Sequence, residues 1–61
     1  LDLEKLSNEE KIFIKILENP RSRDELIRES KLDIGSASAI LSLLEIKGLI
    51  VEELGEVRKT F

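Results

Sequence analysis

Gly48 separates two different apolar periodicities, and only this glycine stands between them. Before it, apolar residues recur at spacings of three and four, the pattern of an amphipathic helix that turns one face toward a core. Directly after it, Leu49, Ile50 and Val51 form a run typical of a β-strand. Because glycine suits the left-handed conformation that ends many helices, the junction predicts a helix that passes at once into a strand.

The helix before this glycine is predicted to begin after Asp33, whose carboxylate can accept hydrogen bonds from first-turn amides. It ends with Lys47 at the negative end of its dipole. The strand run after it is followed by a turn at Leu54 and Gly55 and by a second run at residues 57–61, which predicts a β-hairpin. The expected core positions of the helix are Ile34, Ala37, Ile40, Leu41 and Leu44.

A capping box marks the start of an earlier helix. Ser7 can accept from the amide of Glu10, whose carboxylate can reach back to the amide of Ser7. Pro20 disfavours the helical conformation of the residue before it, so this helix should close near Glu18. Its apolar face is expected to comprise Ile12, Phe13, Ile16 and Leu17, and Ile14 broadens that face.

The same box recurs at Ser22 and Glu25 and predicts a short second helix over about Arg23–Ser30. Lys31 follows, at a place where many helix-turn-helix units have glycine. A left-handed conformation there would cost a non-glycine residue on the order of 1 kcal/mol. Either the turn has a different shape or it tolerates this strain. The apolar contributions of this segment are expected from Leu26, Ile27 and Leu32.

Three helices followed by a hairpin predict a mainly α fold with a small β-hairpin, the winged helix-turn-helix, with a two- or three-stranded wing. A short third strand around Arg21 could complete the wing. With 61 residues, the chain can form one domain over residues 1–61, with an aliphatic core because Phe13 and Phe61 are its only aromatic residues. It begins with Leu1 rather than Met, so we expect the C-terminal fragment of a longer protein.

Composition excludes several functions. The chain has no cysteine and no histidine, which removes disulfides, thiolate or imidazole metal sites and nucleophile–histidine pairs, and we expect no metal and no cofactor. Glu52 and Glu53 are adjacent in a strand and point to opposite faces, so no catalytic residues and no enzyme activity are predicted. Without a long apolar run or a signal peptide, a soluble cytoplasmic protein with no membrane partner is expected.

The DNA-reading chemistry of a winged helix is largely missing. Ten basic residues face thirteen acidic ones, a net charge of −3, and Glu52, Glu53 and Glu56 lie in the wing. Phosphate contacts could come from Arg21, Arg23, Arg28, Lys31, Lys47, Arg58 and Lys59, and those around the second helix could instead pair with Asp24, Glu25 and Glu29. The outward side of the third helix offers short or apolar side chains at Gly35, Ser36, Ser38, Ala39, Ser42 and Ile46, none able to contact a base edge in bidentate fashion.

These small residues permit close approach of another protein, with Ile46 and Leu43 supplying apolar contact. Alternatively, Ile46 packs under the hairpin and the face has no partner. We therefore expect a protein–protein or interdomain contact. The alternatives are a weak DNA-binding module and a winged-helix segment of a transcription regulator or chromosome-segregation complex.

The segment "SASAILSLLEIKGLI", preceded by "LSNEEKIFIKIL" and "SRDELIRESKLDI", resembles the C-terminal winged-helix domain of the DNA-processing protein A family, also called DprA or Smf, from Leu6 to about Arg58. The resemblance implies a bacterial parent protein that acts in natural transformation, or competence, and in DNA recombination. Such a parent receives single-stranded DNA and loads the RecA recombinase, mainly through a Rossmann-like domain that this chain lacks. That domain, a second copy or a competence protein would be the expected partner.

Overall fold

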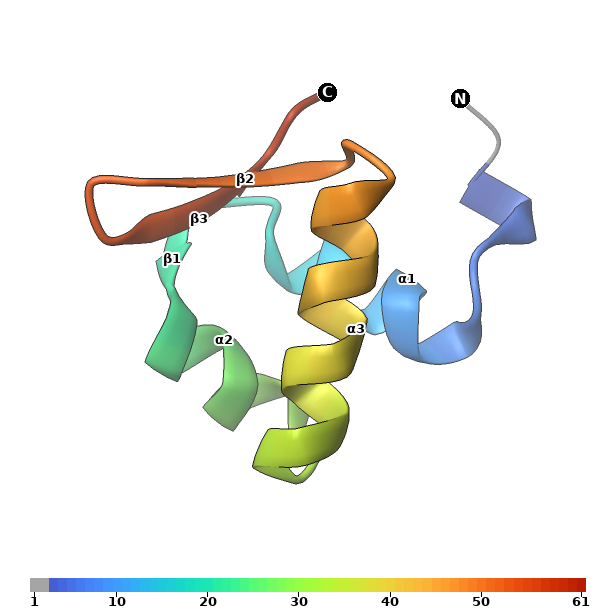
Figure 1. Cartoon of the computed structure of the whole chain (residues 1–61), viewed down its shortest axis with the longest axis horizontal. Helices are drawn as coiled ribbons and strands as arrows, with labels where there is room; N and C mark the ends of the chain where they lie inside the picture. Colours follow the sequence, from blue (N-terminus) through green and yellow to red (C-terminus); the bar gives the residue numbers. More distant parts are fainter. Residues whose placement is uncertain (1–2) are drawn as a thin grey trace.

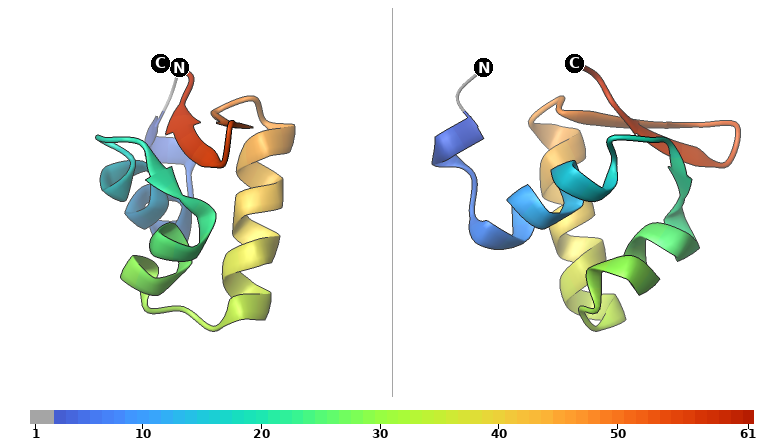
Figure 2. Two further views of the ribbon diagram at one scale, coloured as in Figure 1. Left: turned by 90° about the vertical axis from the view of Figure 1, so that its left-hand side faces the viewer. Right: turned by 180° about the vertical axis from the view of Figure 1, so that it is seen from behind.

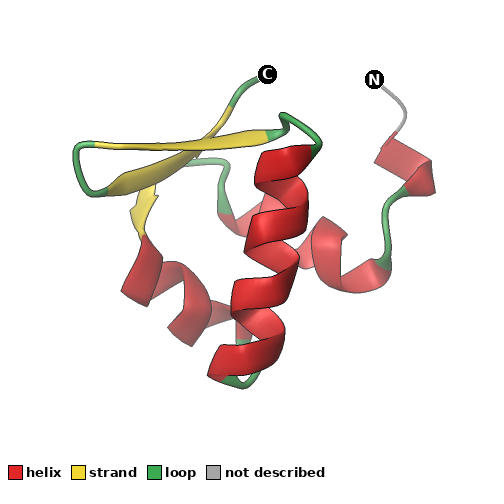
Figure 3. Cartoon of the chain, viewed as in Figure 1, coloured by secondary structure: helices red, strands yellow, loops and turns green. Residues whose placement is uncertain are grey.

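The computed structural model describes residues 3–61, and its elements follow the order expected of a winged helix (Figures 1 and 3). A short 3-10 turn precedes three helices, and the last of these leads into the hairpin. The fold is therefore mainly helical with a small three-stranded wing, as predicted. The bounds are η1 (Leu3–Lys5), α1 (Asn8–Ile16), β1 (Arg21–Ser22), α2 (Arg23–Ser30), α3 (Ile34–Ile46), β2 (Ile50–Glu53) and β3 (Glu56–Lys59).

The first two helices begin at the predicted serines. At α1 the capping box is complete, since Ser7 Oγ accepts from the Glu10 amide at 3.2 Å and the Glu10 carboxylate accepts from the Ser7 amide at 3.0 Å. At α2 only half of the box forms: Ser22 Oγ accepts from the Glu25 amide, but the Glu25 carboxylate accepts from the Ser22 hydroxyl. The other end of α1 lies slightly earlier than predicted, with Leu17 as its C-cap.

Helix α3 has the two ends that the sequence predicts. Asp33 accepts from the Ser36 amide at 3.0 Å, and hydrogen bonds from the Ser36 hydroxyl and amide hold the pKa of Asp33 below its ordinary value. At the other end Gly48 has φ +77° and donates to the Glu45 carbonyl, while the Leu49 amide donates to the Leu44 carbonyl, each at 3.0 Å. This pair of bonds is a Schellman motif, which turns the chain directly into β2.

The core lies where the three helices and the wing meet. Each large side chain buried there contributes roughly 1.5–3 kcal/mol. Two predicted core positions were wrong: Ile12 is 42% exposed and Ile34 is 73% exposed. Successive helical residues differ by about 100°, so with Phe13 facing inward α1 buries Ile14 rather than Ile12. Ile34 is the first residue of α3, beyond the reach of the core. The largest fully buried side chains are Phe13, Leu17, Leu26, Leu41, Leu44 and Val57.

The wing is an antiparallel sheet with strand order β1-β3-β2, so the third strand around Arg21 is present. Val57, in the central strand, pairs with Arg21 on one side and with Glu52 on the other. Between β2 and β3, Leu54 and Gly55 both have positive φ, at 53° and 80°, which corresponds to a type I′ turn. The hairpin extends from the C-terminal end of α3 and passes over β1 (Figures 1 and 2).

Candidate interaction surface

The outward side of α3 is a continuous uncharged surface. Gly35, Ala39, Ser42 and Ile46 follow one another at spacings of four, three and four, so they share one side of the helix, and all four are exposed. The opposite side carries the buried Ala37, Leu41 and Leu44. The left view of Figure 2 shows α3 along one side of the molecule with α1 and α2 together on the other. We call the residues Gly35, Ser36, Ser38, Ala39, Ser42, Leu43 and Ile46 the α3 face.

Two apolar side chains project from the C-terminal half of the α3 face. Ile46 is 82% exposed, so the alternative in which it packs under the hairpin is wrong. Leu43 is 43% exposed and lies three residues earlier, which places it beside Ile46. Of the remaining members, Ser38 is half-buried and the other four are exposed. Leu43 and Ile46 were both named from the sequence as the apolar contacts of this face, and both are exposed in the structure.

One edge of the α3 face is joined to the wing by Arg23. Its Nη1 lies 3.4 Å from Glu45 Oε1 on α3 and 3.3 Å from Glu52 Oε1 on β2. This guanidinium therefore connects the first turn of α2, the last turn of α3 and the wing. Two carboxylates already surround it, so Arg23 has little positive charge left to offer a phosphate.

Lys47, the C-cap of α3, joins the same end of this helix to α1. Its Nζ donates to Glu10 Oε2 at 2.8 Å, and Glu10 is only 3% exposed. This hydrogen bond, followed by the one from the Ser7 amide, holds the pKa of Glu10 below its ordinary value of 4.5. Glu10 thus has two structural functions, one in the capping box of α1 and one in this tether. Neither the burial of Glu10 nor its pairing with Lys47 was predicted.

The wing's own cations are engaged as well. Arg58 Nη2 donates to Glu53 Oε1 across the hairpin. Lys59 Nζ lies 5.3 Å from the centre of the Phe61 ring, a cation–π contact. At the base of the wing, Arg21 Nη1 lies 3.0 Å from Glu29 Oε2, one of the ion pairs expected as the alternative to phosphate binding.

Arg28 and Lys31 differ from the other candidate cations. Both are exposed, and within residues 3–61 no carboxylate lies within ion-pair distance of either. Lys31 has φ 62°, so the turn between α2 and α3 does adopt the left-handed conformation without a glycine. Of the seven predicted phosphate-contact residues, five therefore have partners within the chain: four pair with carboxylates, and Lys59 contacts the Phe61 ring.

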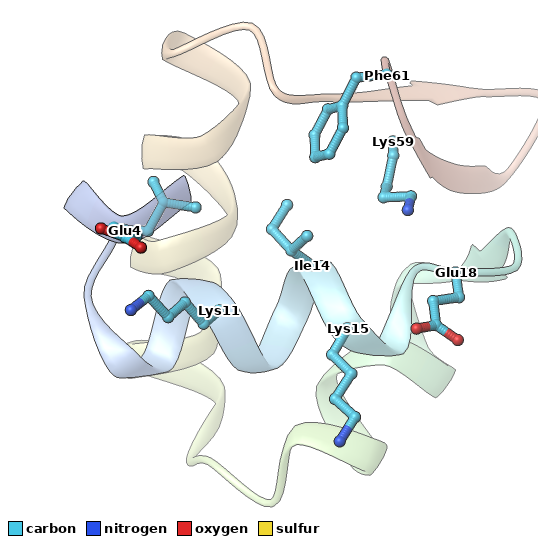
Figure 4. Close-up of a pocket in the computed structure, with 8 residues that line it drawn as sticks. Glu4, Lys11, Ile14, Lys15, Glu18, Lys59 and Phe61 are labelled. Carbon is cyan, nitrogen blue, oxygen red and sulfur yellow. The ribbon is translucent and has the colours of Figure 1, made fainter. Parts of the chain in front are cut away.

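A hollow lies on the far side of α1 from α2, with a volume of about 450 Å³ (Figure 4). In the close-up the Ile14 side chain lies between the Phe61 ring and the α1 helix, Lys11 and Lys15 point outward at the margins, and Lys59 lies beside the Phe61 ring. The hollow is lined by Glu4, Leu6, Lys11, Ile14, Lys15, Glu18, Lys59 and Phe61.

No group of three or more potential metal-ligating residues occurs in the described part of the chain. None of the helices described is long and apolar enough to cross a membrane.

Comparisons with known proteins agree with the geometry. The family model of the DprA winged helix domain matches residues 3–56, which is most of the chain. No curated protein and no solved structure matches the sequence significantly. The three helices, β1 and β2 fall within the matched range, which ends at Glu56, the first residue of β3. The chain belongs to the DprA winged helix domain family.

Proposed function

We propose that this chain is an accessory, non-catalytic interaction domain of a DprA-like DNA-processing protein. Its α3 face contacts another protein surface: the Rossmann-like domain of its own parent, a second copy or a competence partner. The parent would act in the cytoplasm of a bacterium in natural transformation and recombination. Single-stranded DNA handling and RecA loading would be functions of the parent's other domain.

The observation that carries this proposal is the exposure of Ile46 on an uncharged helix face. A side chain that is 82% exposed contributes little to the core, yet its burial in an interface can contribute roughly 1.5–3 kcal/mol. Leu43 extends the apolar area, and Gly35, Ala39 and Ser42 let a partner approach the backbone closely. The outward side of α3 has no arginine, lysine, asparagine or glutamine with which to contact base edges.

The wing supports the same conclusion. In a DNA-binding winged helix it would lie near the phosphate backbone, and here Glu52, Glu53 and Glu56 would oppose that placement. The cations that could compensate are already paired: Arg23 with Glu52, and Arg58 with Glu53. These ion pairs engage two of the three wing carboxylates, Glu52 and Glu53, which argues against acid–base catalysis by that adjacent pair.

The proposal is tested by titrating the labelled domain with the remainder of its parent protein, supplied in trans, and following amide shifts by NMR. Saturable shifts are expected on the α3 face, and Ile46→Asn should weaken binding by about tenfold or more. The control is Ile12→Asn, which makes the same substitution on α1, outside the α3 face, at a side chain that is 42% exposed. Equal affinity for the wild type and Ile46→Asn would contradict the assignment of the α3 face.

A second candidate function, weak DNA binding, is favoured by one observation: Arg28 and Lys31 have no carboxylate within ion-pair distance among the described residues. With only these two cations to contact phosphates, the affinity for DNA would be low and would be lost between low and physiological salt. Fluorescence anisotropy with duplex DNA over a salt series tests it, and absence of binding even at low salt excludes it.

Family membership argues against the third alternative, a transcription regulator or chromosome-segregation segment; a Rossmann-like domain upstream is expected only for a DprA-like parent.

A further inference from the structure

The tip of the wing, residues 53–56, has features that the fold does not require. Leu54 is fully exposed and has φ 53°, a left-handed conformation that costs a non-glycine residue roughly 1–2 kcal/mol. Asparagine or glycine would form the same type I′ turn with less strain. Leu54 therefore adds strain and exposed apolar surface, and its side chain makes no contribution to the core.

The charges at the tip add a further cost. Glu53 and Glu56 are direct cross-strand partners, and like charges in this position destabilise a hairpin. Arg58 compensates Glu53, but within residues 3–61 no cation lies within ion-pair distance of Glu56. The tip is thus an exposed leucine next to one negative charge, that of Glu56, which no cation of the described residues compensates. A complementary surface would have an apolar floor and a positive rim.

Such a surface exists on the same chain. A shallow groove of about 580 Å³ lies along α2 and the turn into α3. Ile27 and Leu32 are half-buried in it, and Ile34 is 73% exposed. Arg28 and Lys31, the two unpaired candidate cations, line it against a single acid, Asp24. We call it the α2–α3 groove; its lining is Asp24, Ile27, Arg28, Lys31, Leu32 and Ile34.

We propose that the wing tip of one copy docks in the α2–α3 groove of a second copy. Leu54 would cover the exposed Ile34, and Glu56 would face Lys31 and Arg28. The tip and the turn between α2 and α3 lie at separate ends of the molecule, so one copy cannot close this contact on itself (Figure 1). A two-fold pair would make the contact twice, each copy supplying one tip and one groove.

The same contact accounts for both left-handed non-glycine residues of the described chain. Leu54 lies at the tip and Lys31 in the groove, and glycine would serve the backbone better at either position. A single hairpin tip buries less than the roughly 1,200–2,000 Å² of a stable interface, even when the contact is made twice. The association is therefore weak, and it is sensitive to salt because opposite charges form its rim.

Charge reversal in two complementary variants tests this contact. The wild type should show amide shifts at residues 31, 34, 54 and 56 that grow from micromolar to millimolar concentration and shrink in high salt. Glu56→Lys and Lys31→Glu should each lose most of this concentration dependence, because like charges then meet in the groove. An equal mixture of the two should recover it, since each tip then finds an oppositely charged groove.

Three controls separate this contact from other associations. Glu18→Lys makes the same charge change as Glu56→Lys at an exposed position outside both surfaces and should associate like the wild type. Leu54→Asn should fold at least as stably as the wild type and lose association. Ile46→Asn should leave the concentration-dependent shifts at residues 31, 34, 54 and 56 unchanged, so that failure here and failure of the proposed α3 contact remain distinguishable. Concentration-independent wild-type shifts, or a mixture that behaves like its separate components, would overturn the proposal.

Discussion

Replacing Lys47 with methionine is expected to show how much the tether between α1 and α3 contributes. The Lys47 Nζ donates to Glu10 at 2.8 Å, with side-chain exposures of 39% for the lysine and 5% for the glutamate. Hydrogen bonds to charged groups contribute roughly 1.5–3 kcal/mol. Because solvent reaches the lysine, we expect a loss of about 1–2 kcal/mol at neutral pH. For a domain of this size each kcal/mol lowers Tm by about 4–8 °C.

The lowered pKa of Glu10 determines how the stability difference between the wild type and Lys47→Met changes with pH. The pKa of Glu10 is lowered in the folded state, so its contribution is present above the ordinary value of 4.5 and is lost as pH falls through the lowered pKa. The difference between the wild type and Lys47→Met should therefore shrink in acid. What remains is the interaction of Lys47 with the negative end of the α3 dipole, about 0.3–1 kcal/mol.

Urea unfolding of both proteins at pH 7 and at about pH 3, followed by circular dichroism, measures the two differences. Lys11→Met is the matched control, since Lys11 is exposed and, in the part of the chain described, has no carboxylate within ion-pair distance. It should change the free energy of unfolding by less than about 0.5 kcal/mol. The reasoning is refuted if the Lys47→Met difference is equal at both pH values, or if Lys11→Met is as costly.

Three further predictions concern backbone strain and burial. Lys31→Gly should raise the free energy of unfolding by about 0.5–1 kcal/mol because φ is 62° there, and a decrease in Tm would contradict the strain. Gly48→Ala should lower the free energy of unfolding by about 1–2 kcal/mol because of the left-handed backbone conformation alone, since an added Cβ would meet nothing within 4 Å. Urea midpoints measure this change, and an unchanged midpoint would contradict the left-handed cap. Leu41→Ala should lower the free energy of unfolding by about 2–5 kcal/mol and leave little folded protein. Ile46→Asn should change the free energy of unfolding, measured by thermal denaturation, by less than about 0.5 kcal/mol. Similar destabilisation by these last two would contradict the assigned burial.

Local signals in the sequence were enough to predict most of the fold. Ser7, Asp33 and Gly48 each fix a helix end through bonds to residues a few positions away, so their functions can be predicted without knowing the tertiary structure. Burial was less predictable, because helical periodicity indicates an apolar stripe but not where the core stops. Ile12 and Ile34 fit the period, yet lie beyond the sides that the core covers.

The candidate site depended on contacts that are remote in sequence. The pairs of Arg23 with Glu45 and Glu52 span 22 and 29 residues, and the pair of Lys47 with Glu10 spans 37. No local pattern could show which cations would be engaged by carboxylates in this way. The uncharged character of the α3 face, by contrast, was evident from its residue types. The special position of Leu54 required the backbone conformation of the turn, since the sequence predicted only that a turn would form there.

The central claim is that α3 presents a protein-contact face on a fold often used to bind DNA. NMR titration of the labelled domain with duplex and single-stranded DNA at low salt tests it most directly. The amides of Ser36, Ser38 and Ser42 should show no saturable shifts, with any weak, salt-sensitive change confined to the surroundings of Arg28 and Lys31. Strong, saturable shifts at the three serines would contradict the claim.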